Sequence, residues 1–181
     1  MKHHKREEAQ MELFIAALSD GDHPFAFAAS ASAIGLDEFQ DQVTATGMVR
    51  RLAHEIIVNA RLTGIIVREC DRCLAETELP VDAELSLYYH ITVPGERTTQ
   101  ADDQEIRELS GNHDSIILDE EVRQALLLAI PLKTLCRDDC KGLCSGCGAD
   151  LNNEQCRCTS TEIDPRWQGL AGLFPQEEGE K

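Results

Sequence analysis

The sequence predicts an α+β protein with a strongly curved antiparallel β-sheet in the first half, a helix packed across it, and a C-terminal cysteine-rich, zinc-knuckle-like module. Three observations lead to this prediction. The first half holds long runs in which apolar and polar residues alternate, and a later stretch has helix start and stop signals. From Cys136 to Cys158 the chain is rich in cysteine and glycine and has no apolar period. The length of 181 residues suits a core domain at residues 1–132 and a small module at 133–181.

The strands are expected in the first 90 residues. Between Glu12 and Ala29, two apolar runs flank Asp20-Gly21-Asp22, which predicts a pair of strands joined by a turn. Val43–Leu52 and Glu55–Cys70 are rich in Val, Ile and Thr and predict two more strands. Strict alternation over Glu78–Tyr89 predicts a half-buried strand.

The second half begins with an acidic segment at residues 94–115, which we expect to be a mobile loop because it has few large apolar residues. A helix is predicted next, with Asp119 as its cap, Glu120 and Glu121 at the positive end of its dipole, and Pro131 ending it. The residues expected to face the sheet are Val122, Ala125, Leu126 and Ala129. Asp164-Pro165 predicts the start of a short C-terminal helix.

The net charge of −16 argues against nonspecific binding to the phosphate backbone and favours a basic partner. The N-terminus resembles a signal peptide, but Glu7, Glu8 and Glu12 stand where apolar residues should begin. No run approaches the roughly 18 apolar residues that span a bilayer. We therefore expect a soluble cytoplasmic protein without membrane association, whose reduced thiols bind metal in preference to forming disulfides.

Eight cysteines are the main candidates for a functional site. Cys144-Ser145-Gly146-Cys147-Gly148 has the form of a metal knuckle, in which glycine accepts a positive φ at the tight reversal around the ion. Cys156 and Cys158 offer a second close pair after a short loop. Four thiolates this close in sequence suit one tetrahedral ion.

The other four cysteines could form a second site from Cys70, Cys73, Cys136 and Cys140. Spacing alone also permits exchange of pairs between the two sites, and Cys70 and Cys73 could instead be small buried hydrophobic residues. Zinc, as one or two ions, is the expected cofactor, although an iron–sulfur cluster uses the same ligands.

Catalysis is not expected, and neither is a small-molecule substrate. A closed four-thiolate site has no open coordination position for hydrolysis, and the sequence holds no phosphate-loop or Ser-His-Asp spacing. The main alternative is a thiol redox or metal-delivery protein that uses Cys70 and Cys73, because Arg68 and Arg72 could lower a thiol pKa. Another alternative is a zinc-ribbon nucleic-acid binder in transcription, which the acidic balance disfavours.

The run Leu135–Asn152, which contains Cys136-Arg137-Asp138-Asp139-Cys140 and the knuckle, resembles the YceD family, named for large ribosomal RNA subunit accumulation. Cys70-Asp71-Arg72-Cys73-Leu74, the helix Val122–Pro131 and Ile163-Asp164-Pro165-Arg166 follow the order of that family, so the resemblance covers roughly residues 12–174. The sequence departs from the family pattern at Ser145-Gly146, where proline and a β-branched residue are expected, and at Asp150, where asparagine is common. Neither departure affects a thiol.

The resemblance implies a ribosome-biogenesis factor that supports accumulation or processing of large-subunit ribosomal RNA. Its partners would be that RNA, a basic ribosomal protein, or both, with metal fixing the C-terminal module. The family has no established catalytic residues. Basic residues that flank the cysteines are the candidates for partner binding: Arg68, Arg72, Lys133, Arg137 and Lys141.

Overall fold

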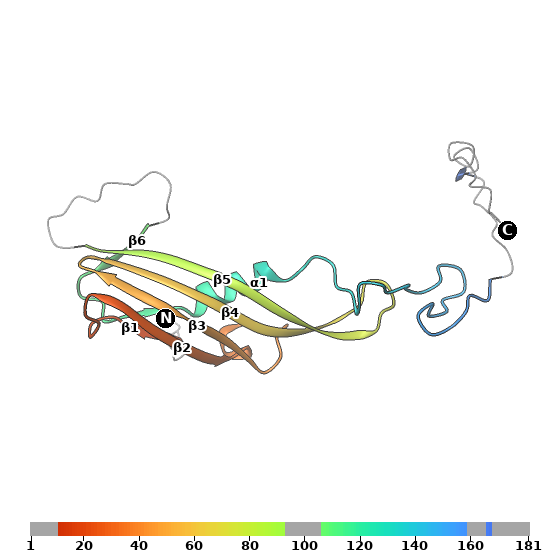
Figure 1. The fold of residues 1–181 in the computed structure, drawn as a ribbon, viewed down its shortest axis with the longest axis horizontal. Coiled ribbons are helices and arrows are strands. Elements are labelled where there is room, and N and C mark those ends of the chain that lie inside the picture. The colour runs from red at the N-terminus through yellow and green to blue at the C-terminus, as the bar shows by residue number, and fades with distance from the viewer. Residues whose placement is uncertain (1–10, 93–105, 159–165, 168–181) are drawn as a thin grey trace, which may run out of the picture.

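The computed structural model describes residues 11–92, 106–158 and 166–167. Within these residues the chain is mostly β-sheet with one α-helix, which agrees with the predicted α+β class (Figure 1). No helix of this part of the chain is long and apolar enough to cross a membrane. The elements in chain order are β1 Glu12–Phe14, β2 Gly21–Ser30, the 3-10 turn η1 Ser32–Ile34, β3 Gln42–Leu52, β4 Glu55–Glu69, β5 Glu76–Thr92, β6 Ile106–Ser110, β7 Ser115–Ile117 and α1 Asp119–Ala129.

The main sheet has the strand order β2-β3-β4-β5-β6. Strands β2 to β5 are successive neighbours, and their pairing is antiparallel, as the sequence predicted for the sheet. Val58 of β4 lies opposite Val49 on one side and Leu87 on the other. The β4–β5 hairpin twists along its length and extends well past its neighbours (Figure 1). Its register runs from Glu55↔His90 to Glu69↔Glu76, whereas β3 pairs with β4 only as far as Thr63.

The core lies between one face of this sheet and α1. Alternate residues of β4 and β5 are buried there because side chains along a strand point to opposite faces. Val122 and Leu126 of α1 are fully buried, and Ala125 and Ala129 pack against the same core, which confirms the predicted helix face. The helix ends as predicted before Pro131, with extended backbone at Ile130.

Two local predictions about pairing and capping are wrong. The predicted pairing of the two strands around Asp20-Gly21-Asp22 does not form: β1 pairs with β7 in a separate two-stranded sheet, and β2 pairs with β3. β2 forms a ladder with β3 along its whole length, which the short β1 cannot offer. Asp119 does not cap α1, whose N-cap is Leu118; its carboxylate instead accepts a hydrogen bond from the Met11 backbone N–H at 2.8 Å.

The predicted acidic loop is also wrong in part. Residues 106–110 form β6, which runs parallel to β5 and makes the sheet mixed. The strand is held because Leu109 packs against the core, and because Arg107 pairs with Glu121 of α1 and lies 5.9 Å from the Tyr89 ring centroid. Residues 94–105 of that loop lie outside the described residues, as does most of the helix predicted after Asp164-Pro165. The domain boundary between residues 132 and 133 stays a prediction.

Candidate metal centres

The turn between β4 and β5 is a knuckle built by the first cysteine pair. Cys70 follows β4 directly, and its N–H donates to the Ala75 carbonyl at 2.8 Å. The Leu74 N–H donates to the Cys70 carbonyl at 2.9 Å, which closes the turn. Leu74 has a φ of 61°, a conformation that favours glycine over leucine.

The second C-x-x-C pair forms the same turn. The Cys144 N–H donates to the Ala149 carbonyl at 2.8 Å, and the Gly148 N–H donates to the Cys144 carbonyl at 2.8 Å. Gly148 has a φ of 73°, as expected for glycine after the second thiol. The two pairs are thus equivalent backbone structures that hold two thiols on one side of a tight reversal.

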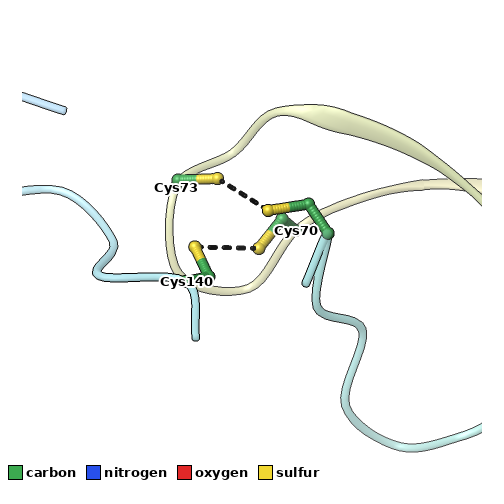
Figure 2. A group of neighbouring side chains, drawn as sticks. Cys70, Cys73 and Cys140 are labelled. Carbon is green, nitrogen blue, oxygen red and sulfur yellow. Dashed lines mark hydrogen bonds between the residues drawn. The ribbon is translucent and has the colours of Figure 1, made fainter. Parts of the chain in front are cut away.

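The first tetrad of thiols joins this hairpin turn to the segment that follows α1. The Cys70 and Cys140 Sγ atoms are 3.9 Å apart, and those of Cys73 and Cys136 are 3.6 Å apart. Figure 2 shows the side chains of Cys70, Cys73 and Cys140 converging at the turn. The four sulfur atoms lie within 4.8 Å of one another, although the two pairs come from distant parts of the sequence.

The second tetrad forms within one short segment. The Cys144 Sγ lies 3.4 Å from that of Cys156 and 3.6 Å from that of Cys158, and Cys147 completes the group. A Cβ atom at position 146 would stand 2.7 Å from the Cys158 Sγ. Gly146, where the family resemblance suggested a β-branched residue, is therefore suited to this close packing. Spacing alone also allowed the cysteine pairs to exchange between the two sites. The structure groups the eight cysteines into the same two sets of four that the sequence analysis proposed.

Both tetrads fit a divalent ion held by four thiolates. A tetrahedral ion with metal–sulfur distances of about 2.3 Å places its sulfur ligands about 3.8 Å apart. The four sulfur separations of 3.4 to 3.9 Å lie close to that value. All eight cysteines are free thiols, and each tetrad offers four of the soft ligands that zinc accepts.

The thiols of each tetrad differ in how readily they ionise. Backbone N–H groups, led by that of Arg72, lower the pKa of Cys70 to about 6. The backbone N–H groups of Cys147 and Gly146 lower the pKa of Cys144 to about 6 in the same way. Hydrogen bonds that the Cys158 thiol donates to the sulfur atoms of Cys156 and Cys144 stabilise its protonated form and raise its pKa to about 12. A cluster of four thiols without a cation thus keeps some of them protonated, whereas a divalent cation would favour four thiolates.

Residues 133–158, which we call the cysteine segment, are attached to the hairpin turn by backbone contacts and by the Asp71 carboxylate. The Asp71 N–H donates to the Thr134 carbonyl at 2.9 Å, and the Thr134 N–H donates to the Asp71 carboxylate at 2.6 Å. The Leu143 N–H donates to the Arg72 carbonyl at 2.9 Å. Gly142, with a φ of 76°, allows this approach because a Cβ there would lie 2.9 Å from the Arg72 carbonyl oxygen.

The predicted partner-binding residues have different surroundings. Arg72 donates to the Cys140 carbonyl at 2.7 Å and so serves the attachment of the cysteine segment. Arg68 pairs with Glu38, and Arg137 pairs with Asp139. Lys133 and Lys141 are exposed and form no ion pair within the described residues. Their role in binding a partner stays a prediction.

Sequence reasoning missed two supporting residues. Thr134 is buried, and its carbonyl accepts from the Asp71 N–H while its own N–H donates to the Asp71 carboxylate. The Asn152 side-chain amide donates to the Cys140 Sγ at 3.5 Å, and its oxygen accepts from the Lys141 N–H at 2.8 Å. No local signal in the sequence marks Asn152 as a partner of a thiol.

Comparison with known proteins supports the family resemblance. The profile of the family described as "Large ribosomal RNA subunit accumulation protein YceD" matches residues 58–174. Uncharacterized proteins of Mycobacterium tuberculosis and Mycobacterium bovis are 29% identical over 130 residues, which is 71% of this chain and 60% of theirs. The "Large ribosomal RNA subunit accumulation protein YCED homolog 1, chloroplastic" of Arabidopsis thaliana is 34% identical over 61 residues, 34% of this chain and 19% of that protein.

The chain thus covers 60% of the length of the mycobacterial relatives that it matches. No solved structure matches it. The family match includes both tetrads, α1 and most of the β4–β5 hairpin.

Proposed function

The chain belongs to the YceD family of large ribosomal RNA subunit accumulation proteins, and on this basis we propose that it is a cytoplasmic ribosome-biogenesis factor that supports accumulation of large-subunit ribosomal RNA. The observation that carries the proposal is the match over residues 58–174, which takes in most of the β4–β5 hairpin, α1 and both cysteine tetrads. The printed name of the Arabidopsis relative supports the same role.

The protein acts by binding and has no reaction of its own. Its net charge of −16 favours a basic ribosomal protein over bare RNA as the first contact, because like charges repel over the screening length. RNA contact, where it occurs, is local and involves the basic residues beside the cysteines, chiefly the exposed Lys133 and Lys141. No small-molecule substrate and no membrane take part.

Zinc is the cofactor that suits the two tetrads. Cys70, Cys73, Cys136 and Cys140 would hold one ion, and Cys144, Cys147, Cys156 and Cys158 would hold the other. Such an ion provides a closed, redox-inactive cross-link between thiolates. The residues of the chain do the rest: the two knuckles orient the thiols, and the Asp71–Thr134 contacts hold the cysteine segment on the hairpin turn.

A thiol redox or metal-delivery protein that uses Cys70 and Cys73 is the second candidate. The lowered pKa of Cys70, to about 6, favours it because a thiolate is the reactive form. Against it, Cys70 is fully buried, and its sulfur lies beside that of Cys140. The two candidates differ in the reactivity of the thiols: metal-bound thiols resist alkylation until a chelator removes the ion, whereas a redox pair reacts at once.

Depletion of the protein in its source organism tests the main proposal. The ratio of mature large-subunit to small-subunit ribosomal RNA is measured by quantitative blotting during depletion, with re-expression of the intact chain as the control. We expect the ratio to fall and re-expression to restore it. An unchanged ratio after complete depletion would contradict the proposal.

A further inference from the structure

Strand β5 has a long edge that no other strand of the described residues occupies. It pairs with β4 along Glu76–His90, but β6 lies beside it only from Tyr88 onward. The other edge of residues 76–87, which we call the free edge, therefore has no neighbouring strand in the sheet order. A free edge of this kind can accept a further strand.

The direction of the backbone groups follows from one hydrogen bond. The Ile91 N–H donates to the His54 carbonyl at 2.6 Å, so the backbone N–H and C=O groups of Ile91 point towards the β4 side of the strand. The register to Glu76 is continuous, and backbone groups alternate in direction along a strand. The even-numbered residues therefore direct their N–H and C=O groups to the free edge. Pro80, which has no N–H, is one of them, so it interrupts the free edge and leaves the β4 ladder intact.

The same even-numbered residues carry the acidic side chains of this strand. Glu76, Glu78, Asp82 and Glu84 are all exposed on the face of the sheet opposite α1. Asp82 pairs with Arg61 of β4. Within the described residues the three glutamates form no ion pair, so the free edge combines unpaired backbone groups with a row of negative charge.

We infer that the free edge of β5 binds a basic, extended polypeptide segment as an added strand. Its backbone would pair with the even-numbered residues of β5, and Lys or Arg at alternate positions would lie beside the glutamates. This inference rests on the proposed function in that it takes the partner to be a basic ribosomal protein. RNA is disfavoured at this edge by charge, and a second copy of this chain would place acid opposite acid.

The edge of β2 provides an internal comparison. It is the opposite boundary of the sheet, and its exposed residues are Asp22, Pro24, Ala26, Ala28 and Ser30. Asp22 is the one charged residue among them, and it pairs with Arg50. Prolines and charges also protect edges against aggregation. The acidic row of β5 could thus serve to prevent aggregation or to bind a basic strand. Prevention of aggregation alone predicts no binding of a basic peptide, so a binding experiment separates the two explanations.

The probe is a labelled peptide of alternating lysine and valine, seven residues long and blocked at both ends, and its affinity for the full chain is measured by fluorescence anisotropy. Two further peptides serve as controls. One has the same composition with the lysines grouped at one end, and the other has N-methyl groups at alternate backbone nitrogens. We expect the alternating peptide to bind at least roughly tenfold more tightly than either control, because strand addition needs both the charge pattern and the backbone donors.

Variants of the chain locate the binding. Glu78→Lys with Glu84→Lys should weaken the alternating peptide roughly tenfold or more, whereas Glu55→Lys with Glu108→Lys, an equal change of charge at the other end of the sheet, should not. Glu84→Pro removes an outward N–H and should weaken binding beyond the effect of Glu84→Gln. Absence of binding to the intact chain, equal binding of all three peptides, or equal loss in both lysine variants would each overturn the inference. Circular dichroism establishes that each variant is folded.

The two proposals can fail separately. If depletion lowers large-subunit ribosomal RNA but the peptide does not bind through the free edge, this inference falls and the proposed function stands. If the peptide binds as expected but depletion leaves the ribosomal RNA ratio unchanged, the free edge stands as a binding site and the proposed function falls.

Discussion

Gly142 and Gly148 provide a matched test of how the cysteine segment is held on the hairpin turn. Both have φ values in the left-handed region, 76° and 73°. A Cβ at position 148 would meet no atom within 4 Å, whereas one at position 142 would lie 2.9 Å from the Arg72 carbonyl oxygen. Gly148→Ala therefore introduces only backbone strain, and Gly142→Ala adds a clash with the backbone of the knuckle.

The two substitutions should differ in free energy by a measurable amount. The left-handed conformation costs a non-glycine residue about 1–2 kcal/mol, and both variants bear this cost. Overpacking against a backbone atom adds about 1–3 kcal/mol in Gly142→Ala. A free energy of 1.4 kcal/mol corresponds to about a tenfold change in an equilibrium constant. The equilibrium constant for opening the contact between Leu143 and Arg72 should therefore be at least roughly fivefold larger in Gly142→Ala than in Gly148→Ala.

Hydrogen exchange at single amides measures this difference. The Leu143 N–H, bonded to the Arg72 carbonyl, and the Asp71 N–H, bonded to the Thr134 carbonyl, report on the attachment. Both should lose protection in Gly142→Ala. In Gly148→Ala the loss should be centred on Cys144 and Gly148, whose N–H groups close the second knuckle. Equal loss at Asp71 and Leu143 in the two variants would refute the role given to Gly142.

Three further predictions concern metal, backbone strain and charge. Protein purified under reducing conditions should hold close to two metal ions per chain, measured by elemental mass spectrometry. Its thiols should react with an alkylating agent only after a chelator has removed the ions. Freely reactive thiols and no bound metal would contradict both tetrads as ion sites. Leu74 has a φ of 61° and is 59% exposed, so glycine at this position would relieve backbone strain at little cost in packing. Leu74→Gly should therefore raise the free energy of unfolding by up to about 1 kcal/mol, seen as a higher denaturant midpoint. A lower midpoint would show that the Leu74 side chain matters more for stability than its backbone conformation. Hydrogen bonds from Arg123 and Gln124 lower the pKa of Glu120 to about 2, so its contribution to stability is present above its ordinary pKa of 4.5 and is lost as the pH falls through about 2. Glu120→Gln should therefore have a lower denaturant midpoint than the intact chain at pH 7, and this difference should shrink as the pH falls towards 2. A difference that stays constant over this range would exclude the carboxylate as its source.

The parts of the fold that the sequence predicted are those with long local patterns. Val43–Leu52, Glu55–Cys70 and Glu78–Tyr89 have the two-residue period of half-buried strands, and the structure has strands at each position. The helix face with Val122 and Leu126 likewise follows from a period that can be recognised within one segment. In these elements the side chains that define the pattern are also those that fill the core.

The parts that the sequence did not predict depend on contacts between distant segments. β1 is too short to show a period, and its partner β7 is more than 100 residues away, as Glu12↔Ile117 illustrates. β6 comes from an acidic segment whose pairing with β5 depends on Arg107 meeting Glu121 and Tyr89. The free edge of β5 could not be predicted either, because its extent depends on where β6 begins beside β5, at Ile106 opposite Tyr88.

The cysteine sites show the same division between local and distant information. The second tetrad closes between Cys144 and Cys156, 12 positions apart, and its knuckle glycine identified it in the sequence. The first closes between Cys73 and Cys136, 63 positions apart, and could be assigned only once the hairpin turn and the end of α1 were placed together. Leu74 stands where the second knuckle has Gly148, so the equivalence of the two turns was hidden by the residue type.

This difference in span gives the two tetrads different structural roles. Closing a loop costs more conformational entropy as it lengthens, and the change from 12 to 63 positions amounts to about 1.5 kcal/mol. The second tetrad can therefore form within its own segment, whereas the first needs the β4–β5 hairpin and α1 in place before its thiols meet. An ion at the first tetrad would cross-link the sheet to the cysteine segment, and an ion at the second would stabilise only that segment. Loss of the first ion should consequently release the segment from the sheet, whereas loss of the second should leave the Asp71–Thr134 attachment in place.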